Sequence, residues 1–178
     1  MEYTIIRSRR KSLSIEITPR GEILVRAPLR LSKRDIQGFV ESRQDWIANH
    51  LSKVPAAVPL SPAEHKSLIL TAKEMLPSRA AFYAKQLDVT FGRITIRSQH
   101  TRWGSCSASG NLSFNCLLML APEEVQNYVV VHELCHRKHM DHSPAFWAEV
   151  EKILPDYRQK KAWLKENGAS LLARLPLP

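Results

Sequence analysis

Cysteine is scarce in this sequence of 178 residues. There are three, none of them in a C-x-x-C pair: Cys106, Cys116 and Cys135. An odd number without close spacing predicts neither a disulfide framework nor a zinc site built from thiolates. Any metal site in this chain is therefore expected to use other ligands.

Long apolar runs are absent as well. No stretch approaches the roughly 18 apolar residues of a membrane span, and residues 1–12, MEYTIIRSRRKS, lack the apolar segment of a secretory signal. Hydrophobic residues still make up 44% of the chain, an ordinary share for a globular protein. We predict a cytoplasmic protein without membrane association, folded as one domain or as one domain with a small appendage.

Acidic residues are outnumbered, with 17 Asp and Glu against 26 Lys and Arg, which gives a net charge of +9. This excess favours anionic partners such as nucleic acid, nucleotides or acidic protein. No recognisable nucleic-acid-binding motif accompanies the charge, so a solvated basic surface explains it equally well. Proximity to nucleic acid is left open, and the sequence does not indicate an oligomeric state.

Three prolines between residues 54 and 62 predict a linker, because they break any regular element there. The segment before it predicts a short strand at residues 3–6 and a hairpin at 13–27 with its turn at 19–21. A single helix capped by Ser32 is predicted at 33–51. We therefore predict a β-hairpin and helix subdomain at residues 1–53, a linker at 54–62 and a metal-binding domain at 63–178.

The second part of the chain mixes helices and short strands. We predict a helix broken or kinked at Pro77, two strands, a loop, a strongly apolar strand, a helix opened by Pro122, a helix capped by Ser143, and a basic helix stopped by Gly168. Their residue ranges are 64–87, 89–91 and 94–96, 101–110, 111–120, from 122 to the end of the apolar pattern at 140–141, 144–155 and 157–167.

The pattern H-E-x-x-H occurs once, at residues 132–136, inside an apolar run that predicts a helix. Residues four apart share a helix face, so His132 and His136 can bind one zinc ion from the same side. Two surface histidines are the alternative, but Val129–Val131 and Leu134 would bury this helix, and burying the motif without a metal would be costly. Glu133 lies about 100° round the helix, where it can act as general base on a water molecule.

The third ligand must come from downstream, where His139 and His142 are the candidates. On a continuous helix His139 would lie about 4.5 Å beyond His136, so the three rings would not converge. His142 converges if the helix ends and the chain turns back, and Ser143-Pro144 is typical of the start of a new helix. We assign His142 as ligand and His139 to the turn, where histidine tolerates positive φ better than most residues.

These motifs resemble those of known zinc peptidases. The spacing of the three histidines is similar to that of metzincins, except that His139 replaces their turn glycine. The wider set resembles the YgjP-like metallopeptidase family, which is related to SprT and WLM zinc proteases. It comprises the basic segment 7–12, R-W-G-S-C at 102–106, the apolar segment 115–122, V-V-H-E-L-x-H at 130–136, and H-S-x-x-F-W at 142–147.

The resemblance implies an α+β, zincin-like fold, in which a sheet packs on the H-E-x-x-H helix. It also implies a metallopeptidase with one zinc ion, or another divalent metal, and a protein or peptide substrate. Two alternatives remain: a metal-dependent nucleotide pyrophosphatase, which the basic charge favours, and a structural zinc module. Arg102 and Trp103 are weak substrate-binding candidates, since a core role for Trp103 and a carboxylate partner for Arg102 explain them better.

Overall fold

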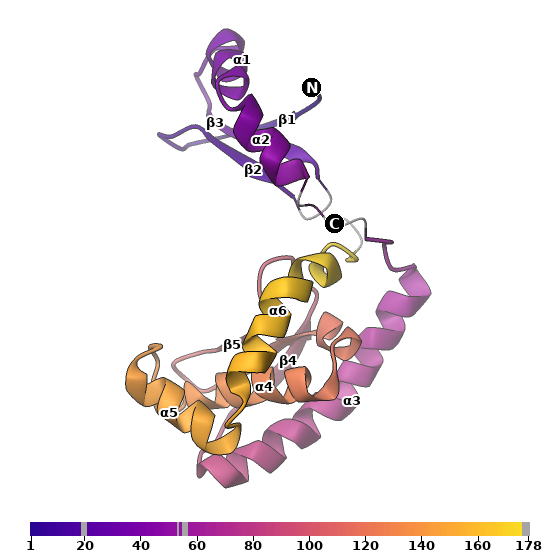
Figure 1. The fold of residues 1–178 in the computed structure, drawn as a ribbon, viewed down its shortest axis with the longest axis vertical. Coiled ribbons are helices and arrows are strands. Elements are labelled where there is room, and N and C mark those ends of the chain that lie inside the picture. Colours follow the sequence, from indigo (N-terminus) through magenta and orange to yellow (C-terminus); the bar gives the residue numbers. More distant parts are fainter. Residues whose placement is uncertain (19–20, 53, 55–56, 176–178) are drawn as a thin grey trace. The chain divides into compact units, whose positions relative to one another are not determined.

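The computed structural model describes residues 1–18, 21–52, 54 and 57–175 and divides into two compact units, Met1–Val58 and Pro59–Pro178 (Figure 1). Residues 19–20 of the predicted turn at 19–21 and residues 55–56 of the predicted linker at 54–62 lie outside the described residues. Within the described residues, no helix is long and apolar enough to cross a membrane.

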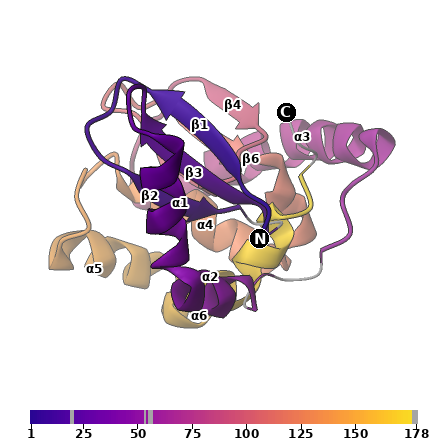
Figure 2. The same ribbon diagram turned by 90° about the horizontal axis from the view of Figure 1, so that it is seen from above.

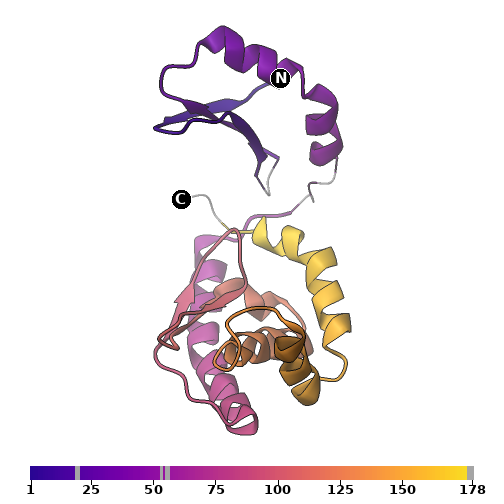
Figure 3. The ribbon, with the colours of Figure 1, turned by 90° about the vertical axis from the view of Figure 1, so that its left-hand side faces the viewer.

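The first unit is a three-stranded sheet with two helices on one face (Figures 2 and 3). Its strands are β1 (Thr4–Ser8), β2 (Ser14–Ile17) and β3 (Ile23–Pro28), in the order β1-β3-β2. β2 and β3 form the predicted antiparallel hairpin, and β1 adds in parallel. Every second residue of β3 is buried, which matches the period of a strand with one covered face.

The prediction of one continuous helix at 33–51 is wrong. The chain forms two helices there, α1 (Lys33–Glu41) and α2 (Gln44–Leu51). Ser32 caps α1 as predicted, accepting a hydrogen bond from the backbone of Asp35. At the break, the Ser42 hydroxyl donates to the Phe39 carbonyl. Such a bond competes with the helical backbone pattern, so the chain turns and both helices reach the sheet.

The second unit begins with α3 (Pro62–Leu87), which starts at a capping box between Ser61 and Glu64 and continues through Pro77 without a break. Its sheet has the order β4-β6-β5, with β4 (Ile94–Arg97) parallel to β6 (Leu112–Asn115) and β5 (Gly104–Cys106) antiparallel to it. Residues 89–91, predicted as strand, form no strand, because the chain there leaves α3 through Asp88 in a left-handed conformation.

The central helix α4 (Glu123–Cys135) packs between α3 and α6 (Tyr157–Leu172), and α5 (Pro144–Ile153) follows it (Figure 3). β5 also contacts α4, so the edge of the sheet lies beside the helix that carries H-E-x-x-H. The core is formed by the apolar faces of α3, α4 and β6. The predicted α+β class, with a sheet packed on this helix, is confirmed.

Two predictions about sheet elements are wrong. Residues 101–110 contain strand β5 rather than loop alone, and residues 111–120 form β6 followed by the 3-10 helix η1 (Cys116–Leu120). The change from strand to helix occurs at Asn115, whose side-chain oxygen accepts a hydrogen bond from the backbone of Leu117. This cap turns an apolar run that periodicity alone assigns to one strand.

The predicted stop at Gly168 is also wrong, since α6 continues to Leu172. Gly168 is buried, and a Cβ there would lie 3.3 Å from Nε1 of Trp103. Glycine at this position therefore allows the Trp103 ring to approach the helix closely, a use of glycine that does not end a helix.

Candidate metal centre

Helix α4 is held by burial on most of its surface. The side chains of Val130, Val131, Leu134 and Cys135 are fully buried, while His132 is half-buried. Glu123 and Glu124 lie in the first turn, where their charge favours the positive end of the helix dipole. The helix ends at Cys135, and His136 keeps helical dihedrals as its C-terminal cap, so the two histidines still share one face.

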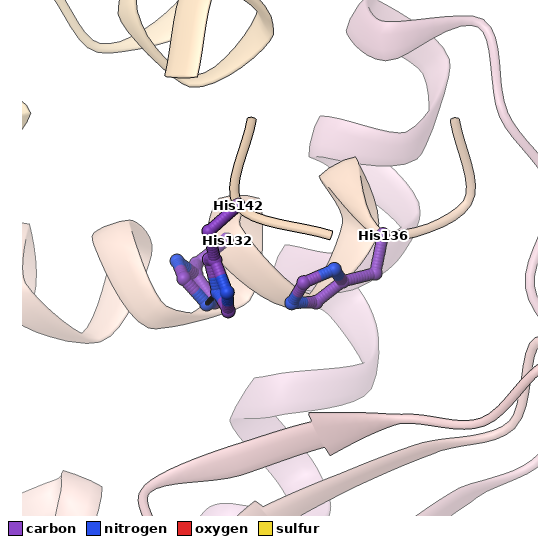
Figure 4. Close-up of side chains that lie close together, drawn as sticks. All are labelled: His132, His136 and His142. Atoms are coloured by element: carbon purple, nitrogen blue, oxygen red, sulfur yellow. Dashed lines mark hydrogen bonds between the residues drawn. The ribbon is translucent and has the colours of Figure 1, made fainter. Parts of the chain in front are cut away.

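The structure brings together the three histidines that the sequence singles out (Figure 4). One ring nitrogen from each of His132, His136 and His142 lies within 4.8 Å of the other two. Nε2 of His132 and Nε2 of His142 are 3.0 Å apart. Two ligand nitrogens of tetrahedral zinc lie about 3.3 Å apart at Zn–N distances of about 2.0–2.1 Å, so the spacing of His132 and His142 is close to that of such a site.

The return of the chain to His142 depends on the turn before α5. The backbone N–H of Ser143 donates to Asp141 Oδ1 at 3.2 Å. Ser143 then caps α5 by accepting from the backbone of Phe146, and Pro144 is the first helical residue, as predicted. The ring of Phe146 lies 4.7–4.9 Å from all three imidazole rings. A buried aromatic residue thus packs beneath the cluster.

His139 has a role in this turn that its side chain does not reveal. Among the described residues, Asp88 is the one non-glycine residue with positive φ, so the chain passes His139 without a left-handed conformation there. Its backbone carbonyl instead accepts a hydrogen bond from Nδ1 of His136 at 3.0 Å. Such a bond fixes the ring and leaves Nε2 with a free lone pair for a metal.

The environment of His132 keeps its ring neutral. Burial, together with the neighbouring His136, His142 and Lys161, lowers the pKa of His132 to about 3. Its Nδ1 is buried without a hydrogen-bond partner in the described part of the chain. The contact with Nε2 of His142, at 3.0 Å, is made by the other ring nitrogen of His132, so in the neutral ring Nε2 can offer its lone pair to a cation shared with the other two histidines. The donor set therefore fits a divalent metal.

Glu133 lies on the side of α4 that faces β5. It is 6% exposed, and burial raises its pKa to about 8, against the opposing charge of Arg102. A Cβ added at Gly104 of β5 would lie 2.6 Å from Glu133 Oε1. The carboxylate is thus packed directly against the backbone of the edge strand, and only glycine leaves room for it there.

Asn115 holds the segment that leads into β5, and sequence reasoning missed this role. It is 1% exposed. Its side-chain amide donates to the carbonyls of Gln99 and Arg102 at 2.6 and 3.0 Å, and its backbone N–H donates to the Trp103 carbonyl at 2.8 Å. A buried asparagine after an apolar strand is a weak signal for such a clamp, because the residues it binds lie 12 to 16 positions earlier.

Arg102 and Trp103 are placed differently by this clamp. Trp103 is half-buried and packs on the main core and on Gly168 of α6. Arg102 is exposed, and its charge lowers the pKa of Glu133. The core role considered for Trp103 agrees with its packing, while Arg102 is near a carboxylate but forms no ion pair with it within the described residues.

The contact between Gly104 and Glu133 gives a prediction. In Gly104→Ala the new methyl group would push the carboxylate aside, since it would lie 2.6 Å from Oε1 and 2.7 Å from Cγ. For the general-base role that the sequence predicts for Glu133, we expect turnover to fall about tenfold or more, because misplacing such a group by about 1 Å can cost about 10², while metal content measured by atomic absorption stays the same. Gly38→Ala, where a Cβ meets nothing within 4 Å, is the matched control and should leave turnover unchanged.

Comparison with known proteins agrees with the class that this centre defines, a metallopeptidase domain. Residues 11–70 and 63–167 match the sequence profile described as YgjP-like, metallopeptidase domain. The chain therefore belongs to the YgjP-like metallopeptidase family, as the motifs suggested. Membership implies a divalent metal and peptide or protein substrates.

Two solved structures are similar to part of the chain. One is the metallopeptidase zymogen abylysin of Pyrococcus abyssi, with 23% identity over 52% of this chain and 94% of that one, at a TM-score of 0.47. The other is the zymogen jannalysin of Methanocaldococcus jannaschii, with 21% identity, coverage of 51% and 91%, and a TM-score of 0.44. No protein with curated function matches the chain significantly.

Proposed function

We propose that this protein is a zinc-dependent peptidase in which His132, His136 and His142 bind the metal and Glu133 is the general base. The observation that carries the proposal is the convergence of three imidazole nitrogens within 4.8 Å at the end of the helix that also bears Glu133. The family to which the chain belongs supports peptide hydrolysis as the reaction.

The chemistry of the ligands favours zinc over a harder cation. Magnesium and calcium prefer oxygen ligands, whereas zinc binds imidazole nitrogen and, in catalytic sites, takes three protein ligands and leaves a position open. A bound zinc ion supplies a Lewis acid that acidifies water and polarises the scissile carbonyl. The protein contributes three imidazoles, and burial lowers the pKa of two of them, His132 and His136.

Glu133 performs the proton transfers in this proposal. Burial raises the pKa of Glu133 and favours the protonated acid, whereas the positive charge of Arg102 favours the ionised form that the base requires. In that form Glu133 accepts a proton from the attacking water and delivers it to the amine that leaves when the peptide C–N bond breaks. Proton transfer by a positioned side chain requires that the side chain be held, and the packing of Glu133 between α4 and Gly104 supplies this. Asn115 supports this packing indirectly, because its side chain holds the segment before β5.

In this proposal the substrate binds along the edge strand β5. It forms one edge of the sheet, and it is paired on its other side with β6. An extended peptide can add to such an edge through backbone hydrogen bonds, which would carry its scissile bond past Glu133.

The proposal is tested by incubating zinc-loaded full-length protein with an unfolded protein substrate such as casein and following new N-termini by mass spectrometry. We expect cleavage that a chelator abolishes and added zinc restores, while circular dichroism shows that the metal-free protein keeps its fold. A metal-loaded, folded protein that cleaves no peptide bond, or one that hydrolyses nucleoside triphosphates alone, would contradict the proposal.

A further inference from the structure

Positive charge lies on two sides of the candidate metal centre. Most basic side chains around it are already paired: Lys138 with Glu149 at 2.7 Å, Arg158 with Glu151 at 3.4 Å, and Lys160 with Asp156. Arg137 donates to the carbonyls of Thr90 and Ala108. Among the exposed cations that form no ion pair within the described part of the chain, Arg102 and Lys161 lie close enough to act on residues of the centre, Arg102 on Glu133 and Lys161 on His132.

Lys161 approaches the centre from α6. Its Nζ lies 4.1 Å from the centroid of the Trp147 ring, within the range of a cation–π contact. That ring in turn lies 5.7 Å from the ring of His142 and 5.8 Å from that of His132, centroid to centroid. The ammonium group is therefore placed over an aromatic surface that borders two of the three histidines.

Arg102 approaches from the sheet. It stands two residues before Gly104, the residue packed against Glu133, and its backbone carbonyl is held by Asn115. The clamp fixes the backbone while the side chain stays exposed. An extended guanidinium at the entrance to β5 can bind a carboxylate through two parallel hydrogen bonds.

We infer that the centre selects acidic peptide segments, with Arg102 and Lys161 binding substrate carboxylates on either side of the scissile bond. This inference rests on the proposed peptidase function and adds its substrate class. The unpaired cations favour negative side chains, and a peptide lying along β5 would present such side chains to both of them. Two carboxyl groups lie near the centre. Asp141 is engaged with the backbone of Ser143, and Glu133, whose pKa Arg102 lowers, forms no ion pair with Arg102 within the described residues.

The test uses zinc-loaded full-length protein and three fluorogenic peptides that share one cleavage sequence. The positions flanking it carry glutamate, glutamine or lysine. We expect kcat/KM to fall from the glutamate to the glutamine to the lysine peptide by about tenfold at each step, because mismatched charge is strongly disfavoured at such a surface. The preference should weaken as salt concentration rises, since exposed charges are screened.

Charge reversal identifies the residues. Arg102→Glu and Lys161→Glu should each lower kcat/KM for the glutamate peptide and raise it for the lysine peptide, so that the ratio between them shifts about tenfold or more. Arg102→Lys and Lys161→Arg should retain the preference. Lys73→Glu, which reverses an exposed charge on α3, is the control and should leave the ratio unchanged. Thermal melts and zinc content show whether each variant is folded. If a charge reversal does not fold, the neutral substitution at the same position, Arg102→Gln or Lys161→Gln, replaces it.

The outcomes separate this inference from the function on which it rests. Equal kcat/KM for the three peptides would overturn the inference and leave the peptidase intact, as would a ratio that Lys73→Glu shifts as much as the other reversals. Absence of cleavage of every peptide by a zinc-loaded protein would overturn the peptidase itself. Hydrolysis of nucleoside triphosphates in place of peptides would show that the two cations bind phosphate, and would also overturn the inference.

Discussion

Glu133→Gln is expected to lower turnover by roughly 10² or more, the range for loss of a general base, while zinc still binds. Glutamine has nearly the same shape as glutamate, so it should keep the packing against Gly104. It cannot accept the proton that the attacking water gives up. The proposed metal ligands are the imidazoles of His132, His136 and His142, and none of them is altered.

The measurement is kcat on the cleaved peptide, with zinc content and thermal stability determined on the same samples. Glutamine is neutral, whereas a carboxylate with 6% exposure is costly to ionise. When both proteins are compared without metal, the variant should therefore be at least as stable as the parent. Parent-level turnover in a variant with full zinc content would exclude Glu133 as the base and favour the structural-zinc alternative.

The parts of the centre that the sequence could predict are those set by local geometry. The relation between His132 and His136 follows from the pitch of one helix, and the turn towards His142 follows from Ser143 and Pro144 at the start of the next. The structure places all three rings together. Where one helix and one cap decide a position, the pattern of residues is sufficient to predict it.

The parts that the sequence could not predict depend on contacts between distant segments. Gly104 is required by Glu133, which lies 29 positions later, and Gly168 by Trp103, which lies 65 positions earlier. In sequence these glycines resemble a loop residue and a helix stop. Asn115 likewise looks like part of a strand until its three carbonyl partners at 99–103 are known. Such roles follow from tertiary packing, which overrides local preference.

Removing His142 should weaken zinc binding far more than removing His139, although the two residues are three positions apart in the same turn. His142 offers Nε2 at 3.0 Å from Nε2 of His132, so His142→Ala deletes one of three ligands. We expect an affinity loss greater than the 10–100-fold typical of outer-sphere changes. His139 contributes its backbone carbonyl to Nδ1 of His136, and His139→Ala keeps that carbonyl, so its affinity should stay close to that of the parent. Zinc titration against a competing chelator measures both, and equal losses would show that His142 is not the third ligand.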